Sequence, residues 1–134
     1  MIYADSGIII RLIEGVDKVR APIMECLREI DDPDRIIVTS RLTTLECRCR
    51  PMRDGQDELL GLYDRFFSSR EVILRELDAA VVEKATVLRA SSGLRTPDAI
   101  HAATAILSGA SAFWTTDKRF SKCAELAVQL FQAA

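Results

Sequence analysis

The sequence predicts an α/β fold of three layers, α/β/α, around a mostly parallel five-stranded sheet. Two observations support this prediction. Five short blocks rich in isoleucine, valine and aromatic residues have the composition of strands. One or two segments with helical spacing of apolar residues separate each block from the next, and such crossover connections make neighbouring strands parallel, with helices on both faces of the sheet.

The strands are expected at five places, from the first residues to the last. They are Ile2–Ala4, Arg35–Thr39, Glu71–Arg75, Ala112–Thr115 and Ala127–Phe131. No repeat or linker divides the chain between them, so we expect one domain over residues 1–134, a length typical of single domains.

Two helices are expected between the first and second strands. Ser6 is a candidate cap for the first, which ends at Gly15. The second carries apolar residues at spacings of four, four and three over Val19–Ile30. It ends before the loop Asp31–Asp34, whose proline and aspartates favour a turn.

Two further helices are expected between the second and third strands. Ser40 is a candidate cap for a helix through Arg48, which we expect to stop near Pro51 because proline lacks a backbone N–H. The next helix begins at about Asp54 and carries apolar residues at helical spacing as far as Phe67.

Three helical segments are expected in the last part of the chain. Apolar residues mark one over Leu77–Leu88, followed by a loop at Ser91–Gly93. Thr96 and the proline after it are typical of a cap and a first helical turn, and they begin the alanine-rich helix Pro97–Ser108, which should be buried. A short helix near Lys118–Glu125 precedes the final strand.

Composition excludes several classes of protein. No apolar run approaches the ~20 residues of a membrane span, and no basic segment precedes an apolar one at the start, so we expect neither a membrane protein nor a secreted one. Four cysteines show neither zinc-site nor disulfide spacing, which favours free thiols in a reducing cytoplasm. A net charge of −2 argues against coating nucleic acid by bulk electrostatics.

Four acidic residues are expected near one edge of the sheet. Asp5 and Asp117 follow the first and fourth strands, Asp98 lies in the first turn of the alanine-rich helix, and Glu46 lies in the helix after the second strand. Ligands of open parallel sheets bind at the carboxyl ends of the strands. Each acid also has a structural explanation: the aspartates can cap helices, and Glu46 can pair with Arg50.

Four segments in order along the chain resemble a known family: Ile2–Ser6, Val38–Glu46, Leu94–Ala105 and Phe113–Phe120. The sequence is similar to PIN-domain ribonucleases, and more closely to the small VapC-type toxins of toxin–antitoxin pairs. The resemblance spans essentially the whole chain.

The resemblance implies that Asp5, Glu46, Asp98 and Asp117 form an acidic metal site, with the hydroxyls of Ser6 and Thr116 as helpers. A set of oxygen ligands favours Mg²⁺ or Mn²⁺ over zinc. Such a site hydrolyses phosphodiesters with a metal-activated water, so we expect 5′-phosphate products. The preference for RNA is implied by the resemblance alone. In this chain Gly7 stands where many relatives carry Ser or Asn.

Two arginines are expected to hold substrate phosphates. Arg50 and Arg53 follow Glu46 by four and seven residues, so helical spacing brings them to its flank. An ion pair between Glu46 and Arg50 is the alternative. His101, three residues after Asp98, is expected to be a buried packing residue rather than a general base.

The resemblance further implies a cognate antitoxin protein and a homodimer as partners. The helix expected over residues 54–67 carries more apolar residues than one core face requires, which favours a dimer. The alternative functions are a non-catalytic PIN-like module that binds RNA or protein, and a haloacid-dehalogenase-like phosphatase. The phosphatase needs an acid two residues after the first aspartate, where this chain has Gly7. A receiver domain needs a lysine in its own strand-end loop, but Lys118 stands beside Asp117.

Overall fold

The computed structural model describes residues 1–31 and 36–132, and every structural statement below refers to these. Five strands form one sheet: β1 (Ile2–Ala4), β2 (Ile37–Ser40), β3 (Val72–Arg75), β4 (Ala112–Thr115) and β5 (Val128–Leu130). Their bounds agree with the expected blocks to within one or two residues. Arg35 and most of the loop expected at Asp31–Asp34 lie outside the described residues.

The sheet is entirely parallel, with the strand order β3-β2-β1-β4-β5. The central strand β1 pairs with β2 on one side and with β4 on the other, so that Tyr3 lies opposite both Val38 and Phe113. The predicted α/β architecture is therefore confirmed. The carboxyl ends of β1, β2 and β4 lie next to one another at one edge.

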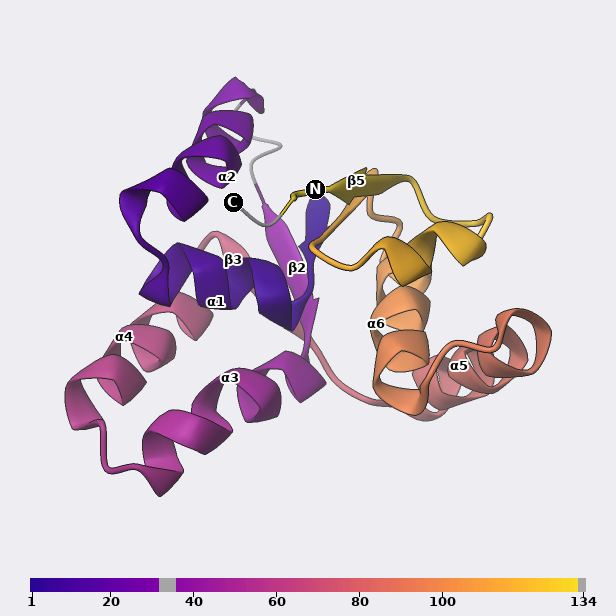
Figure 1. Ribbon diagram of the computed structural model, residues 1–134. Coiled ribbons are helices and arrows are strands. Elements are labelled where there is room, and N and C mark those ends of the chain that lie inside the picture. Colours follow the sequence, from indigo (N-terminus) through magenta and orange to yellow (C-terminus); the bar gives the residue numbers. More distant parts are fainter. Residues whose placement is uncertain (32–35, 133–134) are drawn as a thin grey trace.

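Six α-helices and one 3₁₀ helix surround the sheet. They are α1 (Ser6–Glu14), α2 (Asp17–Glu29), α3 (Arg41–Arg53), α4 (Asp57–Phe67), α5 (Ala79–Ser92), α6 (Thr96–Leu107) and the 3₁₀ helix η1 (Lys118–Lys122). Helices α1 to α4 lie on one side of the sheet and α5 and α6 on the other, which gives the expected three layers (Figure 1).

Successive side chains of each strand point to opposite faces of the sheet, and each face has its own apolar core. Tyr3 and Phe113 face α5 and α6, in a cluster that includes alanines of α6. Their neighbours along the strands, Ile2 and Trp114, face the opposite side, in a cluster with residues of α1, α2, α3 and α4. Both faces of the sheet are therefore apolar, as expected for parallel strands that are covered on both sides.

The start of α1 and the end of α3 differ from the expectations. Helix α1 is capped by Asp5 rather than Ser6, because the helix begins directly after the strand. Helix α3 does have Ser40 as its cap, but it continues through Pro51 to Arg53. Pro51 is buried and lies two residues before the end of the helix, so its missing N–H costs only one intrahelical hydrogen bond in the last turn.

The helices of the second half also differ in detail. Ser91 and Ser92 belong to α5 and bond back to carbonyls of the preceding turn, and only Gly93 ends the helix, in the left-handed conformation. Thr96 lies within α6, whose cap position is Arg95. The segment after β4 is a 3₁₀ helix that ends at Lys122.

Two expectations on general properties can be compared with the described residues. All four cysteines are free thiols, as predicted. In the described part of the chain, the helices are too short or too polar for a membrane crossing.

Candidate active site

Asp5 lies at the end of the central strand, and its carboxylate is buried. Its Oδ1 accepts a hydrogen bond from the backbone N–H of Ile8 at 3.1 Å, which caps α1. Its Oδ2 accepts the hydroxyl proton of Thr115 at 2.5 Å. Since Thr115 ends β4, these two bonds hold the Asp5 carboxylate between two neighbouring strands at the carboxyl edge.

Burial raises the pKa of Asp5 above its ordinary value, although the hydrogen bond from Thr115 opposes this shift. Repulsion from Glu46 raises the pKa of Asp5 further, whereas attraction by His101 opposes it. A buried carboxylate that also feels the charge of a second one favours a cation.

Glu46 extends from α3, where it is half-buried. One of its oxygens, Oε1, lies 2.6 Å from Nε2 of His101 on α6. Burial alone would raise the pKa of Glu46, but the hydrogen bond and the electrostatic attraction of His101, together with a hydrogen bond from Ser6, outweigh this effect and lower it. The carboxylate is therefore ionised at neutral pH, and Ser6 lies beside it.

Asp98 and Asp117 are linked by the guanidinium of Arg119. Its Nε lies 3.0 and 2.9 Å from the two carboxylate oxygens of Asp117, and its Nη2 lies 3.9 Å from Oδ2 of Asp98. Arg95 adds a contact of 3.1 Å to the same oxygen of Asp98. The hydrogen bonds from Arg119 lower the pKa of Asp117.

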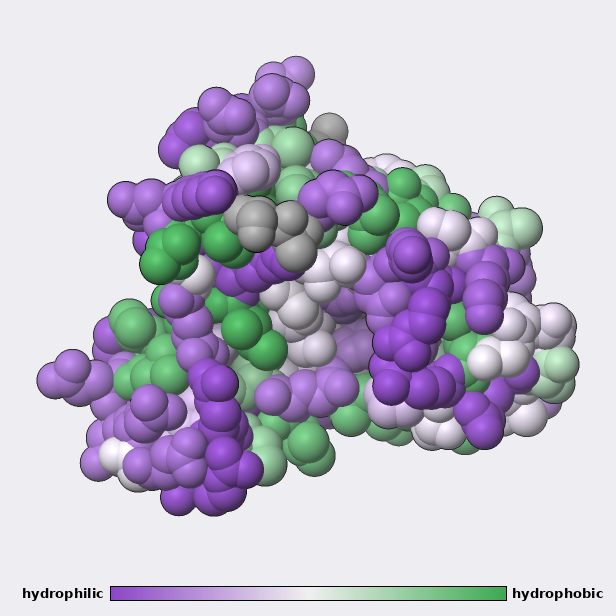
Figure 2. All heavy atoms as spheres, in the orientation of Figure 1, coloured by the Kyte–Doolittle hydropathy of each residue, from purple (hydrophilic) through white to green (hydrophobic). Residues whose placement is uncertain are grey.

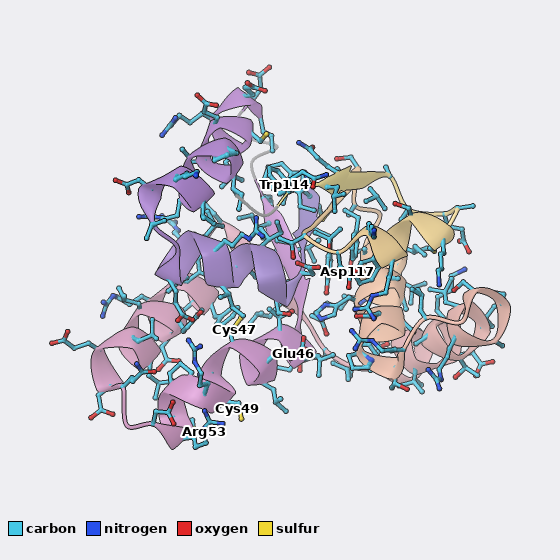
Figure 3. The ribbon with its side chains drawn as sticks, in the orientation of Figure 1. Glu46, Cys47, Cys49, Arg53, Trp114 and Asp117 are labelled. Carbon is cyan, nitrogen blue, oxygen red and sulfur yellow. The ribbon has the colours of Figure 1, made fainter. Side chains whose placement is uncertain are left out.

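A chain of contacts joins these acids across the carboxyl edge. The hydroxyl of Thr115 donates to Asp5 and accepts the backbone N–H of Asp117 at 3.0 Å. Asp117 in turn shares Arg119 with Asp98. Figure 3 shows Asp117 and Glu46 on opposite sides of the opening between α3 and α6, and Figure 2 shows that this part of the surface is hollowed.

The four acids fit a hard divalent cation, because all the ligands they offer are carboxylate oxygens. One of the four, Asp5, is buried and has a raised pKa. In their present conformations, however, no three acidic, histidine or cysteine side chains of the described residues are arranged to hold an ion. Arg119 occupies two of the carboxylates instead. It is exposed on η1, so its side chain can turn away without disturbing a core.

The two arginines expected beside Glu46 are bound elsewhere. Arg50 lies 2.5 Å from Glu14 of α1, so it does not form the alternative ion pair with Glu46. Arg53 pairs with its neighbour Asp54 and lies at the far end of α3, roughly 10 Å along the axis from Glu46 (Figure 3).

Sequence reasoning missed three residues that the structure places at the acids. Arg95 and Arg119 contact the carboxylates of Asp98 and Asp117, and Thr115 bonds to Asp5. Spacing could have indicated them. Arg95 precedes Asp98 by three residues, about one helical turn, Arg119 follows Asp117 by two, and Thr115 is the last residue of β4, next to the carboxyl edge.

The glycine at position 7 has a steric reason in this chain. A Cβ atom added to Gly7 would lie 2.9 Å from Oγ1 of Thr116 and 3.5 Å from Oδ1 of Asp5. The first turn of α1 therefore packs closely against the segment that follows β4. The hydroxyl of Thr116 lies near the acidic site, as Ser6 does.

The family model described as PIN domain matches residues 2–126. This chain belongs to the PIN-domain family. No curated protein matches the sequence.

Solved structures with the same fold come from several bacteria. They include VapBC2 from Rickettsia felis bound to a promoter DNA fragment (17% identity, TM-score 0.78, covering 98% of this chain and 100% of that one). A toxin–antitoxin complex from Klebsiella pneumoniae shares 21% identity (TM-score 0.73, 99% and 100%). VapC20 from Mycobacterium tuberculosis, a toxin that cleaves the sarcin-ricin loop, shares 16% identity (TM-score 0.76, 96% and 99%).

Proposed function

We propose that this protein is a metal-dependent endoribonuclease, the VapC-type toxin of a toxin–antitoxin pair that acts in the cytoplasm. The observation that supports the proposal is the set of contacts through Thr115 and Arg119 that joins Asp5, Asp117 and Asp98 at one edge of a PIN-domain sheet. Glu46 contacts His101, which follows Asp98 by three residues on the same helix. The toxin–antitoxin proteins among the similar structures support the biological role.

In this proposal Asp5, Glu46, Asp98 and Asp117 hold Mg²⁺ or Mn²⁺. A bound ion of this kind supplies an activated water and stabilises the leaving oxygen of a phosphodiester. Within the chain, Thr115 holds the buried carboxylate of Asp5 in place, and Ser6 and Thr116 offer hydroxyls to the surrounding waters or substrate.

Arginine side chains at the rim bind the substrate backbone. Arg119, once it turns away from Asp98 and Asp117, is free to bind a phosphate beside the acids, and Arg95 lies on the same side. Arg50 and Arg53 remain candidates for phosphates further along the strand, because their guanidiniums are exposed on α3.

Incubation of the purified protein with total RNA and Mg²⁺ or Mn²⁺ tests this function. We expect new RNA ends that carry 5′-phosphates, and their loss in Asp5→Asn and Asp98→Asn. Asp57→Asn, an exposed change on α4, is the control that should cleave normally. Ends with 2′,3′-cyclic phosphate would contradict the mechanism, and a folded protein that cleaves no RNA would favour a non-catalytic binding module.

We further propose that an antitoxin and a second copy of this chain are its partners. An antitoxin segment with arginine or lysine would neutralise the acids and block phosphate binding. Co-purification with a small protein that suppresses cleavage would support this idea. The exposed Leu62 of α4 lies on the helix expected to form the dimer, and a monomer in solution would contradict that part.

A further inference from the structure

Tyr3, His101 and Glu46 form a continuous hydrogen-bond chain from the core to the acidic site. Oη of Tyr3 lies 2.6 Å from Nδ1 of His101, and Nε2 of His101 lies 2.6 Å from Oε1 of Glu46. Tyr3 is fully buried on β1 and His101 is 3% exposed on α6, whereas Glu46 is half-buried on α3. The chain thus joins the central strand to a helix on each side of the sheet.

The carboxylate of Glu46 determines the direction of its bond with His101. A carboxylate accepts only, so the nitrogen that faces Glu46 at this distance must carry a proton. The hydroxyl of Tyr3 accepts the backbone N–H of Ser40 at 3.2 Å and forms a second hydrogen bond with Nδ1. Nε2 therefore donates to Glu46, while Nδ1 is paired with the hydroxyl of Tyr3.

No other basic side chain competes for Glu46 in the described contacts. Arg50, one helical turn further along α3, is held by Glu14, and Arg95 and Arg119 contact the other acids. His101 is therefore the group that fixes the direction of the Glu46 side chain, together with the hydroxyl of Ser6. Tyr3 in turn fixes His101 through its hydrogen bond with Nδ1. Tyr3 itself is held in place because its ring stacks on that of Phe113, with the ring centroids 5.1 Å apart.

We propose that Tyr3 and His101 are positioning residues that orient Glu46, with the Nε2–H of His101 holding one carboxylate oxygen so that the other faces the metal ion. The proposal rests on the proposed function, in which Glu46 is a metal ligand. Neither residue touches substrate. They hold the Glu46 side chain in one conformation before the ion binds. Binding the ion then costs less side-chain conformational entropy than it would for a freely rotating glutamate.

The chain offers a sharp experiment, because His101 is its only histidine and so gives a single set of imidazole signals. Nitrogen-15 NMR of the metal-free protein reads the tautomer, and calorimetric titration with Mn²⁺ reads the affinity. The variants are Tyr3→Phe, His101→Leu and His101→Gln. Tyr63→Phe is the matched control, since Tyr63 is an equally buried tyrosine whose hydroxyl donates to Glu14, outside the site.

We expect the wild-type imidazole to carry its proton on Nε2. Tyr3→Phe should keep the proton on Nε2, because Glu46 still requires it, but it removes the partner of Nδ1 and so should weaken Mn²⁺ binding about tenfold, the effect typical of a group that orients a ligand. His101→Leu should weaken binding at least as much. His101→Gln should restore part of the affinity, because its amide can donate to Glu46. Tyr63→Phe should change neither readout.

Two results would overturn the proposal: a wild-type ring protonated on Nδ1 alone, or folded Tyr3→Phe and His101→Leu variants that bind Mn²⁺ as tightly as the wild type. A different result would contradict the proposed function rather than the positioning roles of Tyr3 and His101. A folded wild-type protein that binds no Mn²⁺ contradicts the metal site, whereas the tautomer, measured without metal, still tests the hydrogen-bond chain by itself.

Discussion

Asp5 has two roles that place opposite demands on its charge. As the cap of α1 it accepts a backbone hydrogen bond, but burial disfavours its ionised form and raises its pKa above the ordinary 3.8. A folded-state pKa above the unfolded value means that the folded protein binds the proton more tightly. The stability contributed by this group is therefore present at low pH and is lost as pH rises through the raised value.

Asp5→Asn should stabilise the metal-free protein at neutral pH while abolishing RNA cleavage. The amide oxygen can still cap α1, but the buried charge is gone. Thermal unfolding of both proteins from about pH 4 to pH 8 measures the effect, and the difference in melting temperature should grow with pH. A difference that is constant over this range would show that the charge of Asp5 is not its cause.

Arg119 is a second residue with a testable effect, because its guanidinium occupies the place that a cation would take. Arg119→Ala should tighten Mn²⁺ binding by roughly two- to fivefold, the small effect expected of an exposed ion pair, and should weaken binding of RNA. Calorimetry and a filter-binding assay measure the two effects. Lys122→Ala removes an equal charge from the same 3₁₀ helix without these contacts, so an identical change in both variants would argue against a specific role.

At the scale of elements, two glycines should respond oppositely to the same substitution. Gly93 ends α5 with φ of +71°, so Gly93→Ala should destabilise the protein by about 1 kcal/mol. Gly61 lies inside α4, where an added Cβ meets only Arg65 at 3.6 Å, so Gly61→Ala should stabilise it by about 0.5–1 kcal/mol. Urea unfolding measures the change in the free energy of unfolding for both variants. If both variants were stabilised or both destabilised, this account of the helix end would be wrong.

At the scale of the whole molecule, metal binding should stabilise the fold. The acids come from the junction of β1 and α1, from α3, from α6 and from the segment after β4, so an ion that they share would bind only the folded chain. At a hundred times the dissociation constant, Mn²⁺ should add about 2.7 kcal/mol to the free energy of unfolding. Asp98→Asn should lose most of this gain and Asp57→Asn should keep it, as measured by thermal unfolding with and without Mn²⁺.

Most of the fold could be predicted from local patterns. Strand blocks such as Ile2–Ala4 are short, apolar and β-branched or aromatic, and the helices between them repeat apolar residues every three or four positions. The ends of elements were less predictable, because they depend on single contacts. Pro51 was expected to stop α3, but the helix continues for two more residues, because a proline in the last turn removes only one intrahelical hydrogen bond.

The candidate site could be predicted in its residue types but not in its contacts. The position of Asp5 and Asp117 after strands places them at the carboxyl edge in any parallel sheet. Helical spacing suggested that Arg50 flanks Glu46, but Glu14 of α1 binds that arginine instead. Spacing within one helix cannot reveal a competitor that a different helix supplies.

By itself, the sequence determined the layered α/β class, the alternation that makes both sheet faces apolar and the set of acids, because these depend on residue type and local period. Only the tertiary structure decided which partner each charged group takes. Thr115 with Asp5, His101 with Glu46 and Arg119 with Asp98 and Asp117 are pairings made across elements or turns. They form because folding brings these side chains within hydrogen-bond distance in a partly dry environment, where each polar group must find a partner.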